Sequence, residues 1–160
     1  MSRKLYFKKG ISLVEVLVGA GIILLALVGL IGVYTFYLQT TLSLQERIQA
    51  GALLEEGIEA VKFMRDNGWS SITALSASST YYIVFTGTTW QASSATSSID
   101  GTFYRSFVIN QVYRDVNSQI ASSGTIDPNS RKLTVSVSWR EGKATTTKSL
   151  STYITNIFGT

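Results

Sequence analysis

The chain has 160 residues and contains neither cysteine nor histidine. Without cysteine, no disulfide can hold any part of the fold together. Without histidine, the Ser-His and Cys-His nucleophile pairs and every His-ligated metal site are excluded. A Ser-Lys hydrolytic pair with the spacing S-x-x-K does not occur in the sequence either. We therefore expect no catalytic residue and no cofactor, and the chain is not expected to be an enzyme.

Charged residues are missing from one long segment of the chain: no residue from Val16 to Gln45 carries a charge. This apolar run exceeds the roughly 20 residues that a helix needs to cross a bilayer. It is also longer than the apolar part of a secretory signal peptide, which is about 15 residues at most. The leader before it is basic, so its positive charges should stay cytoplasmic while the chain after about Leu38 lies outside. We expect a single membrane span in the inner (cytoplasmic) membrane.

Glu15 is the exception at the start of this run. An unpaired ionised carboxylate in hydrocarbon costs at least about 3 kcal/mol, so an acid at this depth is treated as functional by default, and a partner for it should be named. The sequence of one copy offers no cation near it on the apolar side.

The motif KKGISLVEVLV, from Lys8 to Val18, resembles the processing signal of type IV prepilins and pseudopilins. The resemblance implies that prepilin peptidase cuts between Gly10 and Ile11 and methylates the new N-terminus at Ile11. Glu15 would then be the fifth residue of the mature chain. Its partner would be the free α-amino group of a neighbouring subunit.

The same resemblance implies several partners and a location. The partners are prepilin peptidase, other pilin or pseudopilin subunits in a helical filament, an inner-membrane assembly platform, and membrane lipid before assembly. The filament would be a cell-surface pilus or a periplasmic pseudopilus. The segment LLEEGIEAVKFMRDNGW resembles minor pilins of the PilV type, and the missing cysteines also favour a minor subunit over a major one.

Gly32 stands where many major pilins have a helix-kinking proline. Glycine weakens a helix by up to about 1 kcal/mol relative to alanine, so the helix could melt locally between Gly29 and Gly32 in a filament. Small residues, including Gly19 and Gly21, also let neighbouring helices approach closely. The sequence is compatible both with local melting of the helix and with close packing against neighbouring helices.

A pI near 9.4 is typical of proteins that bind nucleic acid, but the distribution of the charges argues against such a partner here. Four of the fourteen Lys and Arg residues lie in the leader, and the remaining ten match the ten Asp and Glu residues. Nucleic acid is therefore not indicated.

Beyond the apolar run, Leu54, Ile58, Val61 and Met64 recur at helical spacing, with Ile48 upstream, and predict an amphipathic helix that ends at Asn67-Gly68. The predicted organisation is a leader over 1–10, a transmembrane and assembly helix over 11–38, an amphipathic helix over 39–67, and a β-rich head over 68–160. The fold class is α+β, with the long helix packed on a small antiparallel sheet. The family resemblance makes this layout type IV pilin-like.

The head sequence predicts three or four antiparallel strands separated by turns. The clearest strand is Arg131 to Arg140, where Leu133, Val135, Val137 and Trp139 alternate with polar residues. The other strands are predicted at Tyr81–Thr86, Phe103–Tyr113 and Ala144–Phe158, the last with Leu150, Ile154 and Phe158 on one face. Turns are predicted at Asp100-Gly101, Asp127-Pro128-Asn129 and Glu141-Gly142-Lys143, and a mobile loop at Gln91–Ser98.

The acids on the second half of the helix leave one question open. Glu55, Glu56 and Glu59 form either a solvated helix face or contacts with one of four cations, Arg105, Arg114, Arg131 or Lys132, of the same head or a neighbouring one.

No metal or ligand is expected. The oxygen ligands Asp100, Asp115, Asp127 and Asn129 are too scattered for a contiguous calcium loop. The tryptophans Trp69, Trp90 and Trp139 are assigned to the core or its rim, and no ligand is assigned to them.

Two functions from different classes follow. The first is a structural filament subunit that is processed after Gly10. The alternative is a signal-anchored extracellular binding module whose membrane helix is never cleaved.

Overall fold

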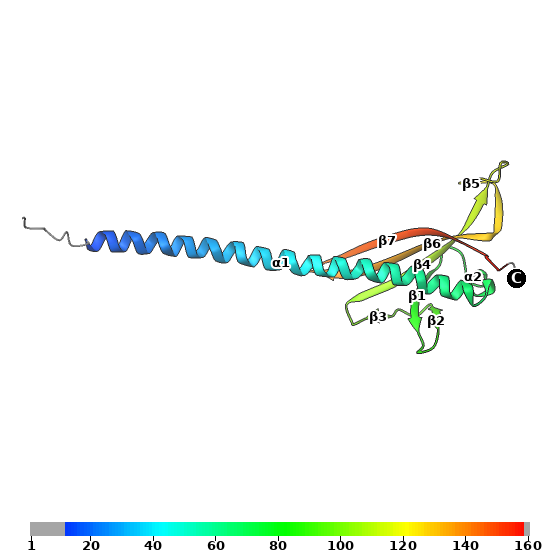
Figure 1. Ribbon diagram of the computed structural model, residues 1–160, viewed down its shortest axis with the longest axis horizontal. Coiled ribbons are helices and arrows are strands. Elements are labelled where there is room, and N and C mark those ends of the chain that lie inside the picture. The colour runs from blue at the N-terminus through cyan, green and yellow to red at the C-terminus, as the bar shows by residue number, and fades with distance from the viewer. Residues whose placement is uncertain (1–11, 159–160) are drawn as a thin grey trace, which may run out of the picture. The chain divides into compact units, whose positions relative to one another are not determined.

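The computed structural model describes residues 12–158 as a long N-terminal helix followed by an antiparallel sheet, an α+β layout (Figure 1). Helix α1 spans Leu13–Asp66, and the short helix α2 spans Trp69–Thr73. The strands are β1 (Thr80–Phe85), β2 (Trp90–Ser93), β3 (Ser98–Ile99), β4 (Phe103–Arg114), β5 (Ile120–Ala121), β6 (Thr125–Glu141) and β7 (Ala144–Thr155).

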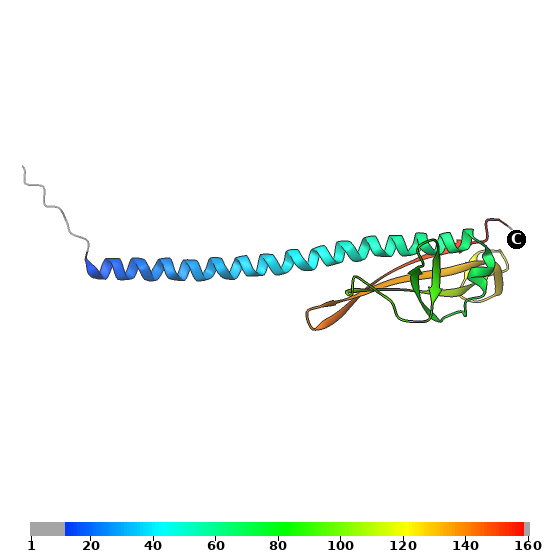
Figure 2. The same ribbon diagram turned by 90° about the horizontal axis from the view of Figure 1, so that it is seen from below.

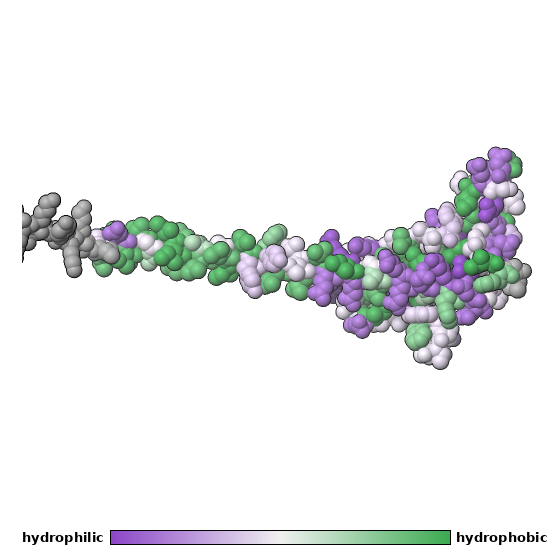
Figure 3. All heavy atoms as spheres, in the orientation of Figure 1, coloured by the Kyte–Doolittle hydropathy of each residue, from purple (hydrophilic) through white to green (hydrophobic). Residues whose placement is uncertain are grey.

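The chain divides into two units after Leu44, and α1 contributes to both. In the first unit, α1 is helical throughout, including Gly29 to Gly32, where the sequence allowed local melting. Many apolar side chains are exposed along this part of the helix, and Figure 3 shows a largely green surface on the face in view. A Cβ added at Gly19, Gly21, Gly29 or Gly32 would meet nothing within 4 Å, so these backbones are open to a neighbour.

The second unit, the head, packs α1 and the sheet around one core. The strands run in the order β2-β1-β4-β6-β7, with β3 and β5 also paired to β4. Figure 2 shows α1 lying along one face of the sheet. The helix buries a stripe there that includes Leu54, Ile58, Val61 and Met64, as predicted, whereas Ile48 is exposed and that prediction was wrong.

Alternation along β6 is confirmed, because Leu133, Val135, Val137 and Trp139 are all buried. A strand with period two places every second residue on the same face, and here that face meets the helix. The predicted turns at Asp100-Gly101 and Glu141-Gly142-Lys143 are also confirmed: Asp100, Gly101 and Gly142 all have positive φ, and Glu141 pairs with Ala144 across the second turn.

The number of strands and one turn were predicted wrongly. Residues 12–158 form seven strands rather than three or four. Strand β6 starts at Thr125, so Asp127-Pro128-Asn129 lies inside a strand. Pairing to β4 shifts register between Gln111 and Val112, which leaves Pro128 to Ser130 without Cα partners on β4. A bulge of this kind accommodates a proline that lacks an amide hydrogen, which explains why turn chemistry misled the prediction.

Two other boundaries differ from the sequence expectation. The segment predicted as a mobile loop begins inside β2, which pairs with β1. The centroids of the Trp90 and Phe85 rings on these two strands lie 5.0 Å apart. Strand β7 ends at Thr155, so Phe158 lies beyond it and is exposed. Leu150 is exposed as well, although Ile154 is buried, because β7 is the edge strand of the sheet.

Gly57 is where α1 comes closest to the sheet. A Cβ at this position would lie 2.8 Å from Val135 Cγ1 and 3.0 Å from Arg105 Cδ. Both distances are shorter than ordinary van der Waals contact, so a methyl group would push the helix away from the sheet. The absence of a side chain at Gly57 therefore sets the spacing of the two layers.

We predict opposite effects for two alanine substitutions in the same helix. Gly57→Ala should lower the free energy of unfolding by about 1–3 kcal/mol through overpacking. Gly51→Ala, where an added Cβ meets nothing within 4 Å, should raise it by up to about 1 kcal/mol through helix propensity. Urea unfolding of the full chain in micelles measures both, and equal effects at the two sites would contradict the close approach at Gly57.

Candidate functional site

The residues that the sequence marks for processing lie at the start of the chain. Gly10 and Ile11 are outside the described residues. Glu15 is described and occupies the first turn of α1, with its carboxylate exposed among the exposed apolar side chains of Leu13, Val14 and Val16. The amides of Glu15 and Val16 both donate to the carbonyl of Ser12, which begins the helix.

This position gives Glu15 a local electrostatic benefit. A carboxylate in the first turn interacts favourably with the helix dipole by about 0.3–1 kcal/mol. Ser12 and Glu15 also have the spacing of a capping box, S-x-x-E, a signal that the sequence reasoning missed. The benefit is smaller than the cost of at least about 3 kcal/mol for the ionised acid in hydrocarbon. No ion pair to Glu15 occurs within residues 12–158, so a partner would have to come from elsewhere.

Within the described part of the chain, α1 is the helix long and apolar enough to cross a membrane. None of the residues in its most apolar stretch is buried within the protein. An unburied apolar helix needs another apolar environment, either lipid or other helices. Length and composition thus make α1 a candidate membrane anchor.

One acid on the head part of α1 meets a cation of the sheet. Glu56 Oε1 lies 3.1 Å from Arg105 Nη1, so this sequence hypothesis is confirmed for Arg105. Arg105 is only 3% exposed; its Nη1 also donates to the Leu53 carbonyl, and its guanidinium lies 5.2 Å from the centroid of the Trp90 ring. Glu59 instead pairs with Lys62 on its own helix. The buried guanidinium thus ties helix, sheet and Trp90 together.

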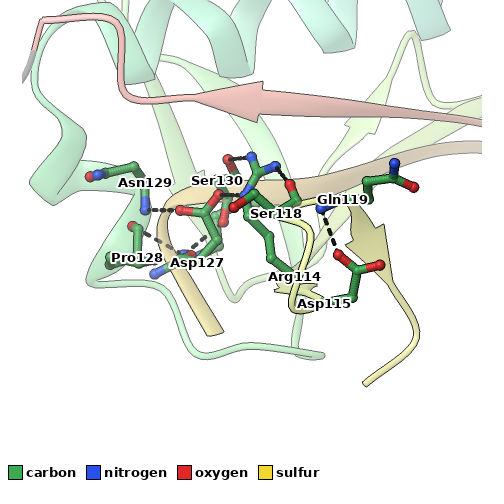
Figure 4. Close-up of polar contacts among 9 residues, drawn as sticks. Arg114, Asp115, Ser118, Gln119, Asp127, Pro128, Asn129 and Ser130 are labelled. Atoms are coloured by element: carbon green, nitrogen blue, oxygen red, sulfur yellow. Dashed lines mark hydrogen bonds and ion pairs between the residues drawn. The ribbon is translucent and has the colours of Figure 1, made fainter. Parts of the chain in front are cut away.

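Arg114 does not meet the helix acids but joins a polar cluster at the β4–β6 bulge (Figure 4). Its Nε donates to Asp127 Oδ2 at 2.6 Å, Nη1 donates to the Ser118 carbonyl, and Nη2 donates to Ser130 Oγ. The hydrogen bond from Arg114 is the main reason that the pKa of Asp127 is lowered, with a further contribution from Ser130. The second oxygen, Oδ1, accepts from the Asn129 amide and so shapes the bulge.

Arg131 holds the same bulge from its other side. Its Nη1 donates to the carbonyls of Asp127, Pro128 and Ser130, and its guanidinium lies 5.7 Å from the centroid of the Trp69 ring. Trp69 Nε1 donates to the Pro128 carbonyl. The two arginines therefore hold an irregular strand segment in place, and neither forms an ion pair with Glu55, Glu56 or Glu59 within residues 12–158. Lys132 is exposed and makes no ion pair within residues 12–158.

Two of the four oxygen ligands considered for calcium are used by the protein itself. Asp115 Oδ1 accepts from the amides of Asn117 and Gln119, and Asp127 is bound to Arg114. Among residues 12–158 no group of three or more acidic side chains is placed to hold a metal ion.

Comparison with known proteins finds no matching family model, no matching curated protein and no matching solved structure. The function is therefore argued from the residues of this chain.

The Asp127–Arg114 pair predicts an acid-dependent part of the stability. A carboxylate whose pKa is lowered by folding stabilises the protein above its unfolded pKa of about 3.9, and this contribution is lost as the pH falls through the lower folded value. Asp127→Asn should therefore destabilise the protein at pH 7 by about 1 kcal/mol and show a smaller loss of stability on acidification than the parent protein. Chemical unfolding at a series of pH values measures this.

Asp100→Asn removes the same charge from a turn residue and provides the matched control. It should change the free energy of unfolding by less than about 0.5 kcal/mol. An Asp127→Asn variant with the parent's dependence on pH would contradict the role given to this pair.

Proposed function

We propose that this protein is a structural subunit, a minor pilin or pseudopilin, of a type IV pilus or a type II secretion-like filament. Prepilin peptidase would cleave it after Gly10, and it would assemble through its N-terminal helix. The observation that carries the proposal is the first part of α1, an apolar helix without buried residues that has a single carboxylate, Glu15, in its first turn.

In the proposed function, the apolar surface of this helix is covered first by lipid and then by other subunits. Lipid of the inner membrane covers it first, because transferring so many exposed Leu, Ile and Val side chains into water is unfavourable. Helices of neighbouring subunits replace lipid during assembly. Gly19, Gly21, Gly29 and Gly32 are open on the helix surface, which permits close contact between backbones.

Glu15 gives this assembly a specific contact. Cleavage after Gly10 would create an α-amino group at Ile11, and that group is a cation at neutral pH. A neighbour's amine beside Glu15 neutralises two charges inside the helical bundle and offsets the desolvation cost of the acid. The contact needs two copies or two related subunits, which favours a filament over a solitary anchor.

The head is suited to a subunit that keeps its shape without covalent links. No cysteine is present, so burial of the helix stripe and the Arg105, Arg114 and Arg131 contacts supply its cohesion. In the proposed filament, the head would lie outside the membrane, on a cell-surface pilus or in a periplasmic pseudopilus. The rival function is an anchored binding module that keeps its leader.

Mass spectrometry of the membrane-extracted protein distinguishes these two functions. We expect a mature chain that begins at Ile11, carrying a methyl group if the peptidase also modifies it. In cells that contain the peptidase, an intact chain beginning at Met1 would support the uncleaved anchor and exclude the filament subunit.

A second prediction concerns the carboxylate of Glu15. Glu15→Gln preserves size but removes the charge, so cleavage should proceed while incorporation into filaments falls by roughly tenfold or more, the equivalent of about 1.4 kcal/mol or more of lost pairing. Quantitative immunoblotting of sheared or cross-linked filaments measures incorporation.

Glu55→Gln is the matched control, because it makes the same chemical change at an exposed carboxylate on the head part of α1. It should be incorporated like the parent protein. Normal incorporation of Glu15→Gln would refute the pairing, even if cleavage after Gly10 occurs.

A further inference from the structure

The chain's single Asn-Gly pair, Asn67-Gly68, follows directly after the end of α1. In this pair the backbone nitrogen of the second residue attacks the asparagine side chain most readily, because glycine has no Cβ to hinder the approach. Asn67 is exposed, and its carboxamide makes no hydrogen bond to any other residue between 12 and 158. The side chain that would react is therefore open to solvent and free to turn.

The reaction that such a pair undergoes is spontaneous deamidation, with water as the co-reactant. The Gly68 nitrogen forms a bond to Asn67 Cγ, the Cγ–Nδ2 bond breaks, and the proton of the Gly68 amide leaves with ammonia. Water then opens the resulting succinimide ring at either carbonyl, which yields aspartate or isoaspartate. One carboxamide and one water are consumed, one carboxylic acid and one ammonia are formed, and nothing is oxidised or reduced.

The folded backbone keeps the attacking nitrogen out of this reaction. The Gly68 amide donates its hydrogen to the Arg65 carbonyl at 3.0 Å, so the proton that must be lost is engaged in a hydrogen bond. The Asn67 amide donates to the Phe63 carbonyl at 3.1 Å, which continues the helical pattern through Asn67. In such a turn, each N–H points back along the helix. The Gly68 nitrogen is therefore directed at Arg65 rather than at the carboxamide.

Helix α2 holds the other side of Gly68. The Gly68 carbonyl accepts from the Ser71 amide at 3.0 Å and lies 2.8 Å from Ser71 Oγ, and the same hydroxyl lies 2.7 Å from the Met64 carbonyl. Trp69 and Ile72 anchor α2 in the core, where they are 7% and 0% exposed. Gly68 can therefore turn only after these contacts open.

We propose that Asn67 is a deamidation site whose reaction is gated by the contact between the end of α1 and α2. The closed head keeps Asn67 as asparagine, and each opening of this contact lets the reaction proceed. The site is independent of cleavage after Gly10 and of assembly through Glu15, since all of its residues lie in the head.

Deamidation makes the opening of the head irreversible. Isoaspartate places an extra methylene group in the backbone before Gly68, so the hydrogen bond to Arg65 cannot re-form with the same geometry. Both products also add a negative charge beside Asp66, at the C-terminus of α1, where the helix dipole disfavours an anion. The modified residue therefore marks those heads that have opened.

The test compares the full chain folded in micelles with the same chain unfolded in urea, at one mildly alkaline pH. Trypsin releases residues 66–105 as one peptide, in which Asn67 is the single asparagine. Growth of the deamidated peptide with time, placed at Asn67 by fragmentation, gives the rate. We expect a rate in the folded protein that is lower by roughly tenfold or more, because the reaction requires local opening.

Ser71→Ala removes the hydroxyl that contacts the Met64 and Gly68 carbonyls. The rate at Asn67 in the folded variant should rise roughly fivefold, as expected for one lost hydrogen bond. Ser70→Ala is the matched control and should react like the parent protein, because Ser70 is an exposed residue of α2 whose hydroxyl makes no hydrogen bond within residues 12–158. In urea all three proteins should react at one rate, and circular dichroism establishes that each variant folds.

Three results would overturn the proposal. The first is an equal rate at Asn67 in the folded and the unfolded parent protein. The second is a slower reaction in urea at Asn67 than at Asn117 or Asn129, both of which precede serine and lie in the tryptic peptide 115–131. The third is an equal rate in the folded Ser71→Ala and Ser70→Ala variants, which would show that α2 does not gate the reaction.

Discussion

The head depends on the burial of one stripe of α1 against the inner face of the sheet. Leu54, Ile58 and Val61 meet the buried side of β6, and Gly57 lets the two layers come close enough for these contacts. Burying a side chain of this size contributes about 1.5–3 kcal/mol, so the stripe outweighs any single polar contact in the head. With no disulfide available, loss of this packing would release the sheet from its long helical cover and leave only the short helix α2, with Trp69 and Ile72 in the core, among the described residues.

Charge plays a different part in each unit. In the head, Arg105, Arg114 and Arg131 lie at places where regular structure is interrupted or tightly packed, and each satisfies backbone or carboxylate oxygens there. In the first unit, Glu15 is exposed among apolar side chains and has only the helix dipole to favour it. Internal contacts explain these three arginines of the head, whereas Glu15 would find its partner in the proposed contact with a neighbouring subunit.

The proposed filament role and the cohesion of the head use separate parts of the chain. Assembly draws on the apolar surface of α1 before Leu44, where no core residue lies. The head draws on contacts such as those of Arg105, which pairs with Glu56 and lies 5.2 Å from the centroid of the Trp90 ring. Substitutions in one region should therefore leave the other intact.

Local periodicity alone determined the long helix, its end near Asn67, its buried stripe and the alternation of β6, because these features depend on neighbours within a few residues. The motif around Gly10, Ile11 and Glu15 was equally visible, since a lone acid in an apolar run needs no fold to be noticed. Only the tertiary structure decided that Pro128 lies in a bulged strand, that Arg105 pairs with Glu56, and that the Trp69 indole of α2 donates to the Pro128 carbonyl. Those arrangements depend on strand register and on contacts between distant segments, which no local pattern in the sequence encodes.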